Sequence, residues 1–173
     1  DLSLDRVGSL LFRFTLEDSL AYARTVELSR SRHPRDTGRP VLQAGQRPGE
    51  GERIVGWDEP IGLERNREIL SVLSGFEGVR AYRTGSSFLG EDIFAADFTV
   101  PYQAALVSRP KLIATKPVLF LSGRQHANEV SSTSHLLRLG ELLVTDPDYR
   151  QLLERVNVVI HPITNPDGVA VAM

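Results

Sequence analysis

A histidine and a glutamate three positions apart, His126 and Glu129, are the residues of this 173-residue chain best suited to chemistry. Zinc takes imidazole nitrogen and carboxylate oxygen together in catalytic sites, which keep one coordination position open for water. On a turn that enters a helix, the Glu129 carboxylate can lie beside the imidazole, where the positive helix end favours an anion. The spacing also arises by chance in a chain with 4 histidines and 22 acidic residues, where Glu129 would be an ordinary first-turn acid.

A catalytic zinc site needs a third protein ligand. His135 lies six positions beyond Glu129 on the same predicted helix, and this offset places it well round the helix surface. His161 ends a strand and is the better candidate, although a histidine there is more often a hydrogen-bonded structural residue. We therefore expect the third ligand beyond Met173 and keep His161 as the alternative within the chain.

The run Asn165-Pro166-Asp167-Gly168 is first of all a turn, because Asn and Asp bond their own backbone, proline fixes φ and glycine permits positive φ. A structural role accounts for these residue types. Their position gives them a further interest, because ligands gather at the carboxyl ends of strands in open α/β sheets. If the strands before the two turns are parallel, this turn lies beside His126.

The elements that position these residues alternate between strand and helix. The apolar run at 116–122 predicts a strand buried on both faces, and 131–144 predicts an amphipathic helix. A short helix at 149–155 and a buried strand at 156–160 follow. A strand, a long helix and a further strand form a βαβ unit, so we expect an α/β fold with a mixed, mostly parallel sheet in a partial three-layer sandwich. Upstream, the patterns predict a helix at 64–73 and paired strands at 78–83 and 92–100.

Composition divides the chain into two parts. Residues 1–62 form an N-terminal extension and a linker rich in Gly and Pro, with a predicted strand at 10–14 and a helix from Thr15. Residues 63–173 form the α/β domain. The chain begins without an initiator methionine and stops at Met173 inside a small-residue run, which suggests a removed leader and a domain cut within its fold.

Charge and cysteine content exclude several classes of protein. The net charge of −2 gives no reason to expect a nucleic-acid partner. The chain has no cysteine, which rules out disulfides and thiolate metal sites. Its apolar runs are far too short to cross a bilayer, so we expect no membrane partner.

In order, the sequence has Lys116-Pro117 and an apolar strand, Gly123 ahead of His126-x-x-Glu129, a long helix, a strand, and Pro162 to Gly168. This succession resembles the zinc metallocarboxypeptidases of the carboxypeptidase A type, over roughly residues 63–173. The His-x-x-Glu and Asn-Pro-Asp-Gly elements together are far more specific than either alone.

The resemblance implies that His126 and Glu129 are the first two Zn²⁺ ligands, and that the turn at Asn165, Asp167 and Gly168 shapes the sheet edge beneath the site. It implies that the third ligand and the glutamate general base lie beyond Met173, so this chain holds no catalytic base. Digestive-type relatives often have arginine just before the liganding glutamate. Asn128 occupies that position here, which changes this part of substrate recognition.

A zinc carboxypeptidase that acts on a peptide or peptide-like substrate is the function that the resemblance implies, in a secreted or exported parent protein. This fragment alone would be inactive. Two alternatives stay open: a zinc-dependent amide deacylase of related fold, and a non-catalytic domain that binds a peptide or a partner. A sheet that lacks its later strands also exposes an edge, so we expect self-association through that edge.

Overall fold

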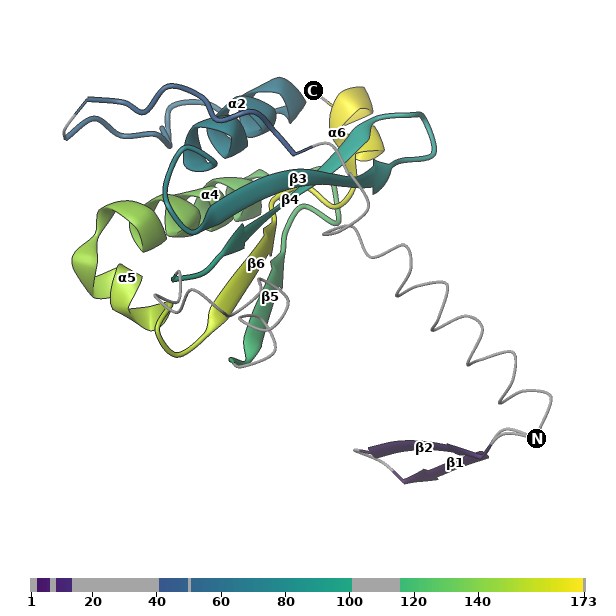
Figure 1. Cartoon of the computed structure of the whole chain (residues 1–173). Coiled ribbons are helices and arrows are strands. Elements are labelled where there is room, and N and C mark those ends of the chain that lie inside the picture. The colour runs from purple at the N-terminus through teal and green to yellow at the C-terminus, as the bar shows by residue number, and fades with distance from the viewer. Residues whose placement is uncertain (1–2, 7–8, 14–40, 50, 101–115, 173) are drawn as a thin grey trace. The chain divides into compact units, whose positions relative to one another are not determined.

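The structure is a computed structural model that describes residues 3–6, 9–13, 41–49, 51–100 and 116–172 (Figure 1). By contacts the chain divides into two compact units, residues 1–39 and residues 40–173. The expected functional boundary between residues 62 and 63 stays a prediction. The predicted helix from Thr15 lies outside the described residues.

In the smaller unit, β1 (Ser3–Arg6) pairs antiparallel with β2 (Ser9–Arg13). The second of these strands overlaps the strand predicted at 10–14.

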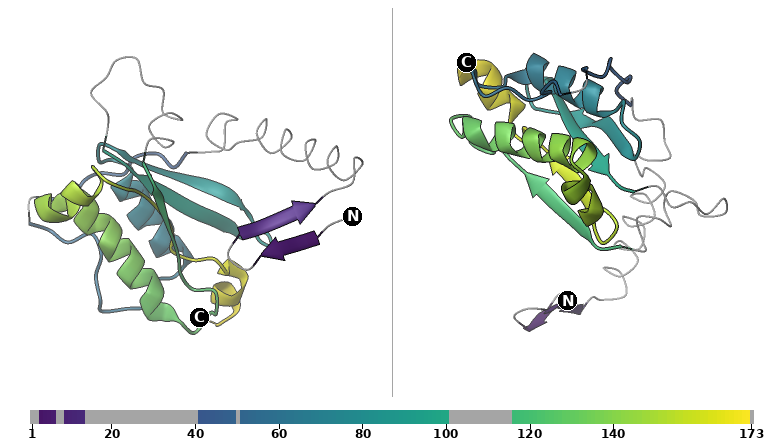
Figure 2. Two further views of the ribbon diagram at one scale, coloured as in Figure 1. Left: turned by 90° about the horizontal axis from the view of Figure 1, so that it is seen from below. Right: turned by 90° about the vertical axis from the view of Figure 1, so that its left-hand side faces the viewer.

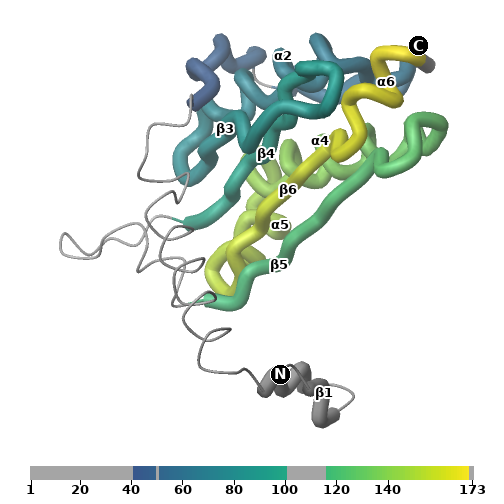
Figure 3. Tube along the Cα trace, turned by 90° about the vertical axis from the view of Figure 1, so that its right-hand side faces the viewer, coloured from purple at the N-terminus to yellow at the C-terminus, as the bar shows by residue number. Residues whose placement is uncertain are grey.

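The larger unit contains a four-stranded mixed sheet with the strand order β3-β4-β6-β5. The expected mixed α/β fold is confirmed. The described sheet is not mostly parallel, however, because β5 pairs parallel with β6 whereas β4 pairs antiparallel with both β3 and β6. Figure 3 shows β5 and β6 side by side and leading to the same edge. The strands are β3 (Val79–Ser86), β4 (Asp92–Phe98), β5 (Val118–Ser122) and β6 (Asn157–His161).

Helices α2 and α4 pack against one face of this sheet (Figure 2). The described helices are α2 (Leu63–Leu73), α4 (Val130–Thr145), α5 (Pro147–Leu152) and α6 (Pro166–Ala172). Asp146 starts α5, because its carboxylate accepts hydrogen bonds from two backbone N–H groups of the first turn, with Pro147 at the position where proline is tolerated. The helices between β5 and β6 confirm the predicted βαβ unit.

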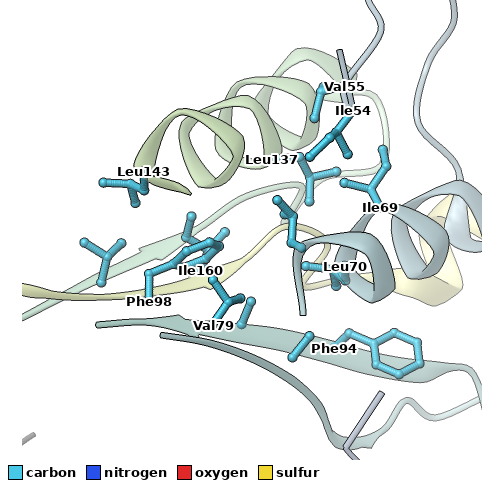
Figure 4. Close-up of a cluster of buried hydrophobic side chains, with 14 of the residues drawn as sticks. Ile54, Val55, Ile69, Leu70, Val79, Phe94, Phe98, Leu137, Leu143 and Ile160 are labelled. Atoms are coloured by element: carbon cyan, nitrogen blue, oxygen red, sulfur yellow. The ribbon is translucent and has the colours of Figure 1, made fainter. Parts of the chain in front are cut away.

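The hydrophobic core lies between these helices and the sheet. Apolar side chains of α2, α4, β3, β4 and β6 meet there, among them Leu70, Leu137 and Phe98 (Figure 4). Ile54 and Val55, which precede the first helix of the unit, belong to the same core. The segment expected to be a linker therefore contributes buried apolar surface, and this burial stabilises the unit.

The expectation that 116–122 is buried on both faces is wrong for this chain. Val118 and Leu119 are each 46% exposed and Phe120 is 57% exposed. The reason is position: β5 is the last strand of the described sheet, with β6 on one side only. An apolar run indicates burial only where a neighbour covers it.

Candidate metal centre

The two turns that follow β5 and β6 lie against each other, as parallel strands require. The Thr164 N–H donates to the Gly123 carbonyl at 3.0 Å, and the Asn165 N–H donates to the Arg124 carbonyl at 3.2 Å. Together they form one edge of the sheet, the place where α/β folds carry their ligands.

His126 and Glu129 meet at this edge. The distance from His126 Nδ1 to Glu129 Oε1 is 2.9 Å, and the two side chains are 75% and 52% exposed. Hydrogen bonding to the imidazole holds the pKa of the Glu129 carboxyl below its ordinary value. The pair thus presents a nitrogen and a charged oxygen side by side and open to solvent.

Backbone structure sets this geometry. Glu129 is the N-cap residue of α4, one position before the helix begins, and its N–H donates to the His126 carbonyl at 3.1 Å. The Ser132 hydroxyl donates to the Glu129 carbonyl at 2.7 Å. A compact turn followed by a helix start therefore places the carboxylate beside the ring, as the spacing predicts.

The donors present fit two positions of a zinc site, and a third is missing from the described residues. An imidazole nitrogen and a carboxylate oxygen are both zinc ligands. Within residues 41–49, 51–100 and 116–172, no group of three or more His, Asp or Glu side chains is placed to hold a metal ion. His161 does not complete the set. Within the described residues it does not group with His126 and Glu129 around one metal position, and its ring packs 5.2 Å from that of Phe120.

The run predicted as a turn at Asn165 to Gly168 is the start of α6: Asn165 precedes the helix, and Pro166 to Gly168 lie in its first turn. This segment, called the Asn165 turn below, holds the His126 loop through side-chain hydrogen bonds. Asn165 Nδ2 donates to the Gln125 carbonyl at 3.1 Å, and its Oδ1 accepts from the Gly168 N–H at 3.0 Å. A Cβ at Gly168 would lie 2.8 Å from that Nδ2 and 3.1 Å from the Ala127 Cβ. The glycine therefore permits the close approach of the two turns.

Asp167 joins the same edge to the turn between β3 and β4. Its carboxylate accepts hydrogen bonds from the Ser87 hydroxyl and, at 3.1 Å, from the Leu89 N–H. The side chains of Asn128 and Gln125 are exposed on the loop. Of the residues predicted to shape the site, Asn165 and Gly168 contact the loop directly, whereas Asp167 anchors a neighbouring turn.

Sequence reasoning missed Arg124, whose side chain is 1% exposed at the base of the loop. Arginine on a turn is normally a surface residue, and the sequence gives no signal for its burial.

Replacing Gly123 by alanine is expected to destabilise this edge. A Cβ there would lie 2.8 Å from Leu136 Cδ1 and 3.2 Å from the Pro162 carbonyl oxygen, which belongs to the backbone. Overpacking of this kind costs about 1–3 kcal/mol. Urea denaturation measures the loss. Gly85→Ala is the matched control, because nothing lies within 4 Å of a Cβ at Gly85. Equal stability of the two variants would contradict the close packing.

The sequence profile of the zinc carboxypeptidase family matches residues 77–173. The chain therefore belongs to the zinc carboxypeptidase family. The resemblance noted from the motifs is confirmed.

Several solved structures share the fold at low sequence identity. A metallo-carboxypeptidase from Burkholderia cenocepacia is 23% identical with a TM-score of 0.53, over 64% of this chain and 28% of that one. Carboxypeptidase A from Helicoverpa armigera is 17% identical with a TM-score of 0.55, over 92% and 35%. Bovine thrombin-activatable fibrinolysis inhibitor, solved in complex with tick carboxypeptidase inhibitor, is 17% identical with a TM-score of 0.51, over 64% and 33%.

The chain thus spans 26–28% of the length of three bacterial carboxypeptidase structures, two from Burkholderia species and one from Shewanella denitrificans. A comparison with curated proteins gives no significant match. No helix in the described part of the chain is long and apolar enough to span a bilayer.

Proposed function

We propose that this chain supplies the first two zinc ligands, His126 Nδ1 and the Glu129 carboxylate, of a zinc-dependent carboxypeptidase. The observation that carries the proposal is the 2.9 Å contact between these two groups, in a member of the zinc carboxypeptidase family and at the carboxyl end of a parallel strand. The third ligand and the general base would come from residues beyond Met173.

The chemistry that zinc supplies when bound is Lewis-acid polarisation of a carbonyl and a nucleophile at neutral pH. This chain would supply two of the ligands, and its other residues hold those two in place. Glu129 stays ionised to lower pH than an isolated glutamate, because the His126 imidazole stabilises its charged form. The Asn165 side chain fixes the loop that carries both groups.

The substrate class that we propose is a peptide or peptide-like molecule with a free terminal carboxylate. The test is release of C-terminal amino acids from a mixed peptide set by the longest native form of the protein. We expect turnover that a chelator and Glu129→Gln both abolish, and no turnover by the 173 residues alone. Release of acyl groups from N-acylated amino acids instead would indicate a deacylase. Peptide binding without turnover in the native form would indicate a binding domain.

We also propose that the isolated chain associates through β5. This strand is the edge of the described sheet, and it exposes Val118, Leu119 and Phe120. An exposed apolar edge strand is a template for pairing with another copy. Sedimentation at rising concentration should show dimers or larger species. Phe120→Lys should shift them to monomer, while Leu152→Lys, at an exposed leucine on α5, should not. A wild-type monomer at all concentrations would refute this proposal.

A further inference from the structure

Arg124 combines two features that are each uncommon. Its side chain is 1% exposed, although charged residues are almost never fully buried unless they are paired. Its backbone φ is 51°, in the left-handed region that residues other than glycine adopt rarely and that often marks functional sites. It is the only such residue other than glycine in the described part of the chain. Both features occur two positions before His126.

The guanidinium of Arg124 connects the ligand loop to a segment far away in sequence. Its Nε donates to the Ala127 carbonyl at 3.0 Å, and Ala127 lies between His126 and Glu129. Its Nη1 donates to the Ile61 carbonyl at 2.8 Å. A planar guanidinium can donate to two acceptors in fixed directions, so one side chain sets the position of the loop relative to Ile61.

The backbone of Arg124 extends these connections to Glu129 and to the neighbouring turn. Its N–H donates to Ser132 Oγ at 2.9 Å, and that hydroxyl donates in turn to the Glu129 carbonyl. Its own carbonyl accepts from the Asn165 N–H. The residue therefore contacts the middle of the ligand loop, the start of α4 and the Asn165 turn.

The segment that accepts the hydrogen bond from Arg124 Nη1, at the Ile61 carbonyl, is itself fixed to the core. Ile61 is 3% exposed, and Ile54 and Val55 are buried in the main cluster. These three residues precede residue 77, where the match to the family profile begins. The support of the loop thus includes residues that the family profile does not cover.

We propose that Arg124 is a positioning residue for the His126–Glu129 pair, and that it holds the loop against the backbone of Ile61. It touches no substrate, and it acts by fixing the backbone that carries both ligands. Through it, residues upstream of the family match form part of the frame of the site. The inference rests on the proposed function for the role of the pair, whereas the contacts to the loop stand on their own.

Hydrogen exchange of the metal-free 173-residue chain tests the proposal. The reporters are the N–H of Glu129, which donates to the His126 carbonyl, and the N–H of Asn165, which donates to the Arg124 carbonyl. In Arg124→Met we expect both to exchange about tenfold faster or more, because the bonds from a charged donor are lost. The exchange rates in Arg124→Lys should lie between those of the wild type and those of Arg124→Met, because an ammonium group replaces only part of the hydrogen bonding of the guanidinium.

A matched control separates positioning from general stability. Thr99→Val removes the buried hydrogen bond from Thr99 Oγ1 to Asn157 Oδ1 at 2.8 Å, at the other end of the sheet. It should lower the midpoint of denaturation without a selective change at Glu129 or Asn165. If Arg124→Met accelerates these two amides no more than Thr99→Val does, the proposal is wrong. Should Arg124→Met fail to fold, Arg124→Lys is judged by the same comparison.

Zinc affinity gives the second readout, in the longest native form. Arg124→Met should weaken binding about 10- to 100-fold, the range typical for residues that orient metal ligands. If the native form binds no zinc, the proposed metal site fails, while the exchange data still decide whether Arg124 positions the loop. If zinc binds and Arg124→Met binds it equally well, the positioning role is refuted and the metal site stands.

Discussion

Alanine at His126 is expected to abolish zinc binding. The imidazole Nδ1 and the Glu129 carboxylate lie 2.9 Å apart and both face solvent, so they can reach one ion without rearrangement of the fold. Loss of a residue that merely orients a metal ligand costs about 10- to 100-fold in affinity. Loss of a ligand itself should therefore raise the Kd at least about 100-fold. Glu129→Gln should weaken binding as well, because it removes the charged oxygen.

Elemental analysis and competition with a zinc indicator measure this effect on the longest native form. His135→Ala is the matched control, since His135 is also exposed and its Nδ1 lies 2.6 Å from the Ser131 carbonyl of its own helix. Without metal, both histidine variants should melt close to the wild-type temperature, because both side chains are exposed and His135 loses only an edge contact with the Trp57 ring. About one zinc per chain in the wild type and in His135→Ala, and none in His126→Ala, would support the site. Equal zinc content in both variants would exclude His126 as a ligand. No zinc in the wild type would refute the proposed metal site.

The sequence predicts the parts of this site that depend on local spacing and on strand direction. The position of Glu129 beside His126 follows from three residues on a turn that enters a helix. The contact between the Asn165 turn and the loop follows from two parallel strands that end at one edge. Both can be inferred because they need only short stretches of chain and one topological rule.

The parts that could not be predicted depend on contacts between segments distant in sequence. In the sequence Arg124 resembles a surface arginine. In the fold it is buried, because the carbonyl of Ile61, 63 positions earlier, accepts a hydrogen bond from it. Glu141 resembles a solvent-facing residue of an amphipathic helix until the backbone of Ile54 covers it. Conversely, Phe120 has the pattern of a buried strand residue and is exposed because no described strand follows β5. Side-chain type predicts burial only on average, and the arrangement of neighbouring segments decides each case.

The Glu141 carboxylate connects the 54–55 segment to α4. The side chain is 2% exposed. Its Oε1 accepts from the Ile54 N–H and its Oε2 from the Val55 N–H, both at 3.0 Å, and Arg138 Nη1 lies 2.6 Å from Oε1. These contacts satisfy two buried backbone donors and the buried charge at once. Few other groups could replace them, because Val55 is wholly buried.

Glu141→Ala is therefore expected to lower the free energy of unfolding by about 2–6 kcal/mol, because the N–H groups of Ile54 and Val55 lose their acceptors and each unsatisfied buried donor costs about 1–3 kcal/mol. Glu141→Gln keeps the shape of the side chain but retains only one acceptor oxygen. It should therefore lower the free energy of unfolding by about 1–3 kcal/mol, because one backbone N–H loses its acceptor. Chemical denaturation measures both. Glu68→Gln is the control, because its ion pair with Arg65 is exposed and such pairs contribute about 0–1 kcal/mol. If Glu141→Ala cost no more than this control, the 54–55 segment would not depend on α4. The link from the core through Ile61 to the ligand loop would then need another anchor.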